Sequence, residues 1–268
     1  MQPNLLKASA LLLALGFADL SAAAVTTIPQ SALGASTTYY TDSIGGVVLG
    51  RNDDGSTAAF NLGYSFTLFG TTYNSLFINN NGNLTFTGPL SDYVPTGPTG
   101  VDLPVVSAWF GDVDTRGALS GEVHAVNDVA NQQLVVTWDN VGYYNAHDDK
   151  LASLQLVLRG DGATIASGEG NVGFFYKQMP WEVTNTSTTA AIGFGDGGGN
   201  AFVLEGTNQP GLNGVAENHH IWFNVEDGGV IGVPPVTAVP EPSTYALMGL
   251  GLAALVLRRR GGLRARSE

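Results

Sequence analysis

Two aspartates that stand two residues apart provide the clearest candidate chemistry in this sequence. Asp112 and Asp114 follow the apolar run 105–110, which predicts a strand. On an extended segment their side chains share a face, about 6–7 Å apart, near the carboxyl separation of an inverting glycosidase. A hydrolase also needs a cleft and one acid with a raised pKa, and nothing in the sequence argues for either. We therefore favour a turn held by Asp112, Thr115 and Arg116 over calcium or ligand binding, and place catalysis last.

Other acidic and amide side chains offer the oxygen ligands that calcium prefers. Calcium takes six to eight oxygens, and the candidate segments are Asn52-Asp53-Asp54, Asp139-Asn140, His147-Asp148-Asp149 and Asp196. No segment has the spacing of an EF-hand loop, and the glycine-rich stretch 195–200 is a single, unrepeated turn. We expect such loops to be solvated more often than metal-bound. The candidate metal or ligand residues are Asp112, Asp114, Asp139, Asp148 and Asp149, with calcium as the candidate ion.

The residue types needed for the common catalytic sites are absent or scattered. The chain has no cysteine, which excludes thiol catalysis and cysteine-bound zinc. Its four histidines show no metal-binding spacing, and neither a G-x-S-x-G elbow nor a phosphate-binding glycine loop occurs. We therefore expect no enzyme. Tyr143 and Tyr144, just beyond a predicted strand, are the candidates for stacking against sugar rings.

The elements that must position these residues are short strands. Runs rich in β-branched and aromatic residues are separated by Gly, Asn and Asp, and no long window has helical periodicity. Strands are expected at 64–69, 75–79, 83–87, 105–110, 121–127, 133–138, 153–158, 172–177, 190–194, 201–205 and 221–225. Asn80-Asn81-Gly82 and residues 128–131 predict hairpin turns. The fold class predicted is all-β, an antiparallel β-sandwich.

The charge of the chain is strongly acidic between its two ends. The net charge is −12, although Lys7 and five arginines after residue 257 supply more than half of the 11 basic residues. Only three of the 23 acidic residues lie before residue 25 or after residue 239. Such a surface repels phosphate backbones, so we expect no nucleic-acid partner.

Both ends of the chain have the composition of targeting segments. Lys7 is followed by the apolar stretch 8–17 and by small residues, which predicts a signal peptide cleaved after Ala24, with Ala22 as the other small residue of the cleavage site. At the other end, an apolar run of about 13 residues, 245–257, is short of the ~20 that a helical span usually needs. Because arginines follow it at once, we expect a membrane-directed tail rather than a core helix. Short apolar helices are expected in both segments.

The C-terminal arrangement resembles the PEP-CTERM sorting signal. Pro240-Glu241-Pro242 precedes the apolar run, and Arg258-Arg259-Arg260 follows it. The resemblance implies an exported protein of a Gram-negative bacterium that is held briefly in the inner membrane. It also implies processing by an exosortase-type enzyme, on a route associated with exopolysaccharide and biofilm material.

The central part of the chain resembles the NIDO domain, the extracellular module first described in nidogens. The matching segments are 76–86, 108–116, 136–144, 154–158, 173–176 with Trp181, and 191–197. The resemblance implies an extracellular, non-catalytic protein associated with cell–matrix adhesion. The chain departs from many animal relatives because it has neither cysteine nor EGF repeats.

These observations predict five segments and one function. The segments are a signal peptide (1–24), a partly irregular stretch with strands (25–59), a NIDO-like β domain (60–227), a linker (228–239) and the sorting signal (240–268). The expected function is adhesion to the matrix, or association with exopolysaccharide, by an exported surface protein. A secreted glycan hydrolase using Asp112 and Asp114, or a purely structural biofilm component, are the alternatives.

Overall fold

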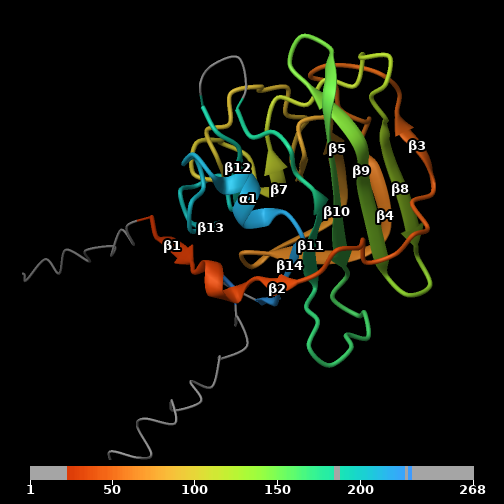
Figure 1. The fold of residues 1–268 in the computed structure, drawn as a ribbon. Helices are drawn as coiled ribbons and strands as arrows, with labels where there is room; N and C mark the ends of the chain where they lie inside the picture. Colours follow the sequence, from red (N-terminus) through yellow and green to blue (C-terminus); the bar gives the residue numbers. More distant parts are fainter. Residues whose placement is uncertain (1–22, 184–187, 227–228, 231–268) are drawn as a thin grey trace, which may run out of the picture.

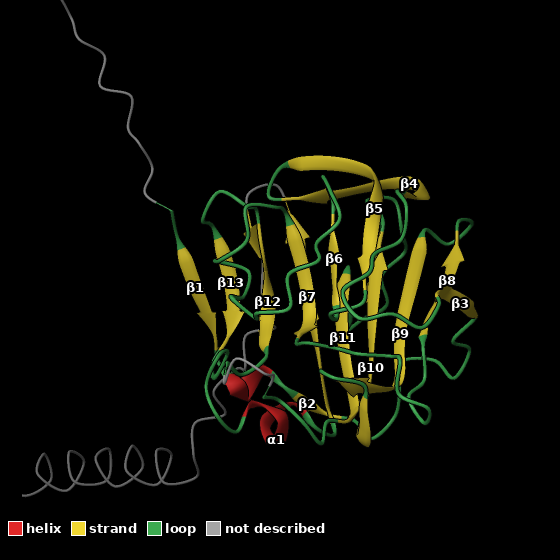
Figure 2. Ribbon diagram, turned by 90° about the horizontal axis from the view of Figure 1, so that it is seen from above, coloured by secondary structure: helices red, strands yellow, loops and turns green. Residues whose placement is uncertain are grey.

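Two seven-stranded sheets pack face to face in the computed structural model, which describes residues 23–183, 188–226 and 229–230 (Figure 1). The first sheet contains, in spatial order, β1 (Val25–Ile28), β13 (Ala201–Leu204), β12 (Ala191–Gly195), β7 (Val105–Phe110), β6 (Asn83–Thr85), β5 (Thr71–Asn79) and β4 (Phe60–Leu68). The second contains β2 (Gly34–Ala35), β14 (His219–Phe223), β11 (Val172–Gln178), β10 (His147–Arg159), β9 (Gln133–Tyr143), β8 (Val123–Asp128) and β3 (Gly46–Leu49). Figure 2 shows the strands of the first sheet side by side, from β1 to β4.

Nearly all strand pairs are antiparallel, and the predicted antiparallel β-sandwich is confirmed. Among the pairs within these two sheets, β1 and β13 run parallel. Three small elements complete the described chain: a 3₁₀ turn (Gln30–Ala32), the helix α1 (Leu212–Ala216), and a short ribbon of β15 (Val225–Glu226) and β16 (Gly229–Val230). Each of the eleven predicted strands overlaps an observed strand, and both predicted hairpin turns join neighbouring strands.

The alternation of apolar residues explains which face of each strand is buried. In β4, Leu62, Tyr64, Phe66 and Leu68 point into the core, while the residues between them are at least partly exposed. This period of two is expected for a strand with one solvated face. The large side chains between the sheets include Trp109 and Trp138, both fully buried. They tie the two layers together by filling the space between them.

The N-terminal stretch 25–59 is built into both sheets. It contains β1, β2 and β3, and its residues 36–42 cover the outer face of the second sheet. There the Tyr40 ring lies 5.6 Å from that of Phe175, and the side chain of Gln155 bonds to the main chain of Thr41. This cover explains why the end of β10 is buried on both faces.

Two connections that cross from one sheet to the other position the candidate site. Residues 50–59 lead from β3 in the second sheet to β4 in the first, and residues 111–122 lead from β7 in the first to β8 in the second. The two connections touch, because the Thr115 N–H donates to the Asn52 carbonyl oxygen at 2.9 Å.

Several sequence predictions concern residues outside the described part of the chain. These are the signal segment up to residue 22, with Ala22, most of the linker, and the whole sorting tail, with Pro240, Glu241, Pro242 and Arg258 to Arg260. The helices expected in the two targeting segments belong to the same group. Within the described ranges, no helix has both the length and the apolar character needed to span a membrane.

Candidate functional site

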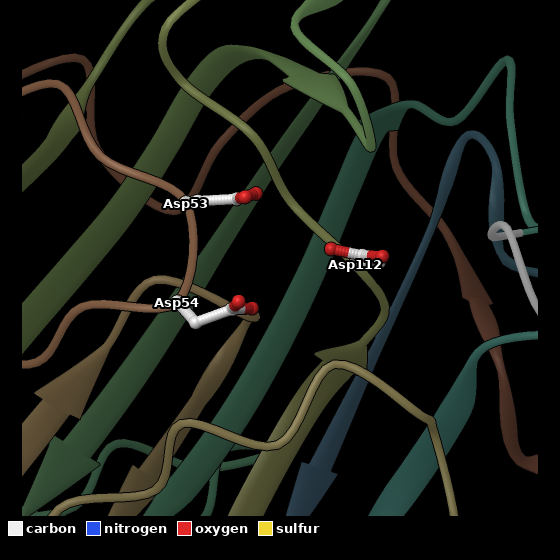
Figure 3. A group of neighbouring side chains, drawn as sticks. All are labelled: Asp53, Asp54 and Asp112. Carbon is white, nitrogen blue, oxygen red and sulfur yellow. The ribbon is translucent and has the colours of Figure 1, made fainter.

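Three carboxyl groups meet where the two connections between the sheets touch. Asp53 and Asp54 lie on the 50–59 connection, and Asp112 lies just after β7. Figure 3 shows Asp53 and Asp54 projecting from one segment toward the segment that carries Asp112. One oxygen from each of the three lies within 4.8 Å of the other two.

The loop that carries Asp53 and Asp54 is fastened to Thr115. The Asn52 N–H donates to the Thr115 hydroxyl at 2.8 Å, and both the Thr115 N–H and its hydroxyl contact the Asn52 carbonyl oxygen at 2.9 Å. The Asn52 side chain accepts the Gly55 N–H at 2.7 Å, which closes the Asn-Asp-Asp-Gly turn. These bonds fix the carboxyl groups on a defined backbone rather than on a free loop.

The predicted Asn80-Asn81-Gly82 turn forms the floor of the site. Asn81 Nδ2 donates to Asp54 Oδ1 at 2.9 Å, and Asn81 Oδ1 accepts the Val113 N–H at 2.9 Å. Asn80 Nδ2 donates to the main-chain oxygens of Asp53 and Val113. Both asparagines are buried. The turn therefore joins the Asp53–Asp54 loop to the segment after Asp112.

Three oxygens around this site are buried and have no hydrogen-bond partner among the described residues. They are Asp112 Oδ2, Asp53 Oδ1 and Asn80 Oδ1. Asp112 is only 1% exposed, so bulk water does not reach most of its side chain. Buried polar atoms are rarely left without a partner, because each costs free energy. When the two carboxyl groups are ionised, all three oxygens are acceptors, which a hydrogen-bond donor or a cation can satisfy.

The electrostatics of the site follow from burial and crowding. Burial raises the pKa of Asp112 to about 7, and the charges of Asp54 and Asp53 contribute to this rise. Burial likewise raises the pKa of Asp53 to about 6, with contributions from the charges of Asp114 and Asp54. Both carboxyl groups thus resist ionisation when no positive charge lies between them.

Asp114 lies in a different environment from Asp112. Arg116 donates to its carboxylate through Nε at 2.9 Å and Nη2 at 2.6 Å, and the Ala146 N–H donates at 2.7 Å. Burial acts to raise the pKa of Asp114, but these hydrogen bonds outweigh it and hold the pKa below its usual value. The sequence predicts a turn held by Asp112, Thr115 and Arg116, but Arg116 forms its ion pairs with Asp114 and, at 2.7 Å, with Asp53, not with Asp112.

The other acidic candidates lie apart from this group and have partners of their own. Asp139 accepts the Tyr39 hydroxyl at 2.7 Å, Asp148 accepts the Leu119 N–H at 2.8 Å, and Asp149 accepts the Tyr143 hydroxyl at 3.0 Å. The structure therefore brings together Asp112 with Asp53 and Asp54, not with Asp139, Asp148 or Asp149.

The two tyrosines proposed for sugar stacking differ in exposure. The Tyr143 ring stacks on His147 at 4.9 Å between centroids and lies 5.7 Å from the Trp181 ring. Tyr144 is 40% exposed, and its N–H donates to the Asp112 carbonyl oxygen at 3.0 Å. Tyr144 is thus the tyrosine of the pair with a large exposed surface, and it is held one hydrogen bond away from the acidic group.

The pairing of Asp53 and Asp54 with Asp112 is the feature that sequence reasoning missed. The Asn-Asp-Asp segment stands out as a source of oxygen ligands, but its partner lies on another connection, after four intervening strands. No local spacing can reveal such a contact. Chemically, the assembled group can hold a cation or share a proton. Asp112 and Asp114 do not form a matched acid–base pair, because Asp114 is buried and bound by Arg116.

Comparison with known proteins agrees with this architecture. The family model described as NIDO related matches residues 32–231, and the PEP-CTERM protein-sorting motif matches residues 238–260. Nidogen of Drosophila melanogaster is 28% identical over 140 residues, which are 43% of this chain and 10% of that protein. The chain thus spans about a tenth of the length of this curated relative. No solved structure matches. The two family matches indicate an exported protein of the extracellular space or cell surface, and the chain belongs to the NIDO-related family.

Proposed function

We propose that this protein is a non-catalytic surface protein that associates with extracellular polysaccharide or matrix. The observation that carries the proposal is the combination of a NIDO-related domain at 32–231 with a PEP-CTERM motif at 238–260. The first supports an extracellular β domain of a non-enzymatic family, and the second supports export on a route linked to exopolysaccharide. The acidic charge of the chain is compatible with a matrix that contains divalent cations.

The β9–β10 hairpin is the surface that we assign to matrix contact. Its tip carries the exposed Tyr144. Leu119, which is 72% exposed, lies beside the hairpin because its N–H donates to the Asp148 carboxylate. The tip is held in place by the Tyr144 and Ala146 N–H groups, which donate to Asp112 and Asp114. A rigid loop with exposed apolar and aromatic side chains is suited to stacking on sugar rings.

A hydrolase built on Asp112 and Asp114 is less well supported. Inverting hydrolysis needs one protonated and one ionised carboxyl group on either side of a substrate. Asp114 is ionised but fully enclosed by Arg116 and the main chain, so it has no free oxygen for a substrate or a water. Three pockets in the described part of the chain, of about 370, 560 and 260 Å³, are lined by other residues.

Matrix association can be tested with a pair of tyrosine variants. The exopolysaccharide of the producing cells is the probe, and binding is measured by co-sedimentation. Tyr144→Ala should bind about three- to tenfold more weakly than the unchanged protein, because an exposed aromatic contact is lost. Tyr93→Ala is the matched control, because Tyr93 is similarly exposed at 44% but lies on another loop. Equal binding by all three proteins would contradict the proposed surface.

The same proposal includes processing at the C-terminal tail. We infer that an exosortase-type enzyme cleaves near Pro240-Glu241-Pro242 and that the tail holds the chain briefly in the inner membrane. Mass spectrometry of both termini, from membrane, periplasmic and secreted fractions, should find the tail in the membrane fraction and a trimmed chain outside. An untrimmed tail on the secreted protein would contradict this route.

A further inference from the structure

We propose that Asp53, Asp54 and Asp112 bind one calcium ion, which fastens the two connections that cross between the sheets. The site lies between the two connections, with Asp112 buried and Asp53 and Asp54 partly exposed, and it does not include the Tyr144 side chain. It is therefore separable from matrix association: the ion can bind whether or not the protein attaches to polysaccharide.

The spacing of the three carboxyl groups suits this ion. For any three atoms that lie within 4.8 Å of one another, there is a point no more than about 2.8 Å from each of them. Calcium–oxygen distances are about 2.3–2.6 Å, so a small inward movement of the side chains completes the contact. Figure 3 shows that Asp53 and Asp54 already point toward the segment of Asp112.

The buried oxygens without partners are the second, independent reason for a ligand. Asp112 Oδ2 and Asp53 Oδ1 belong to two of the three clustered aspartates. Asn80 Oδ1 belongs to the turn asparagine whose side chain donates to the main-chain oxygens of Asp53 and Val113. A proton would satisfy one of these oxygens, whereas a cation with six to eight ligands can satisfy several together.

The negative charges of Asp54 and Asp112 have no counter-ion among the described side chains. Arg116 is the cation that contacts this region, and it bonds to Asp114 and to Asp53 Oδ2. No positively charged side chain forms an ion pair with Asp54 or Asp112 in the described ranges. Two positive charges at the centre of the group would offset the repulsion among the three carboxylates.

The ligand types select calcium among the common metal ions. The group contains only oxygen donors, with neither histidine nor cysteine, which disfavours zinc and copper. Carboxylate oxygens suit the flexible coordination of calcium. Magnesium demands a near-ideal octahedron at shorter distances and keeps most of its waters.

Calorimetric titration of calcium tests the site directly. The protein is purified from cells that express the full 268-residue chain and is stripped of metal with EGTA. We expect one saturable site with a Kd of about 10⁻⁴–10⁻³ M, the range of extracellular calcium modules. At ten times that concentration, the melting temperature should rise by about 3–6 °C.

Two variants and one control assign the binding to these residues. Asp54→Asn and Asp112→Asn should each weaken calcium binding by at least tenfold. Asp54 is partly exposed and its amide keeps an oxygen for the Asn81 donor, so this variant should fold even if the buried Asp112→Asn does not. Asp149→Asn removes an equal charge at an exposed position and should bind as the unchanged protein does.

Three results would overturn the proposal. The first is that the unsubstituted protein gives no heat of binding and no rise in melting temperature up to about 10 mM calcium, well above the expected Kd. The second is equal calcium affinity in the unchanged protein and a folded Asp54→Asn variant, which would locate binding elsewhere. The third is magnesium binding as tight as calcium binding. Loss of matrix binding by Tyr144→Ala leaves all three measurements unchanged, so the two proposals fail separately.

Discussion

At the scale of single residues, Gly82 has the closest main-chain contact among the glycines that the structure describes. Its φ of 78° lies in the left-handed region, and a Cβ at this position would lie 1.8 Å from the Trp109 carbonyl oxygen. The Trp109 N–H in turn donates to the Gly82 carbonyl oxygen at 3.1 Å. The turn between β5 and β6 thus rests against β7 with no room for a side chain, and this contact places Asn80 and Asn81 under the acidic group.

Substitution of Gly82 separates the steric cost from the backbone cost. Gly82→Ala should lower the free energy of unfolding by more than about 3 kcal/mol, since it adds a clash with main-chain atoms to the cost of a left-handed alanine. Gly70→Ala is the control, because Gly70 has a φ of 75° and a Cβ added there would meet open space, so it should lose only about 1–2 kcal/mol. Urea denaturation measures both. Equal losses would mean that the close approach at Gly82 has no energetic weight.

Sequence reasoning reaches some of these residues and not others. The Asn80-Asn81-Gly82 turn is predictable because asparagine and glycine tolerate the backbone angles of a tight turn. Asp112 is predictable as a polar residue at a strand end. Its contact with Asp53 and Asp54 is not, because the contact depends on the paths of two connections whose ends are fixed by strand pairing far away in the chain.

At the scale of elements, the strands from β4 onward in the two large sheets were predictable, and the three short N-terminal strands were not. The runs 105–110 and 172–177 are apolar on both faces and bounded by turn residues, which marks a buried strand. The strands β1, β2 and β3 have no more than four residues, and β1 pairs with β13 at the other end of the chain. Such strands take their conformation from their partner, so local composition carries little signal for them.

One contact between elements can be measured by comparing two tryptophans. Trp138 on β9 donates its Nε1–H to the Asn80 carbonyl oxygen at 2.9 Å, which links the second sheet to the turn of the first. Trp109 is equally buried, but its Nε1 has no partner among the described residues. Trp138→Phe should therefore be more destabilising than Trp109→Phe by about 1–2 kcal/mol, because it leaves a buried oxygen without a donor. Equal losses in denaturant titrations would show that this bond contributes nothing.

At the scale of the whole molecule, Asp53, Asp54 and Asp112 lie where two connections between the sheets meet, so a single bound ion there would link both connections. The connections 50–59 and 111–122 each carry the chain from one sheet to the other, and the β9–β10 tip rests on Asp112 and Asp114. The sandwich has no disulfide to couple its layers, because the chain contains no cysteine. Packing of the core provides most of the coupling between the two sheets. An ion bound here would add a second link, at the end of the sandwich that carries the β9–β10 tip.

Hydrogen exchange can show whether calcium acts on this end alone. Removal of calcium with EGTA should speed amide exchange in residues 52–55 and 112–116 by about tenfold or more, since these two segments carry the ligands of the ion. Exchange at Tyr144 should also speed up, because its N–H donates to the Asp112 carbonyl oxygen. Amides of Leu154, Leu156 and Leu158 in the middle of β10 should exchange at unchanged rates, because the core opens only by global unfolding. Asp54→Asn should exchange rapidly at the same loops with or without EGTA. If EGTA instead speeds exchange evenly across both sheets, calcium stabilises the whole fold rather than the loops that present Tyr144.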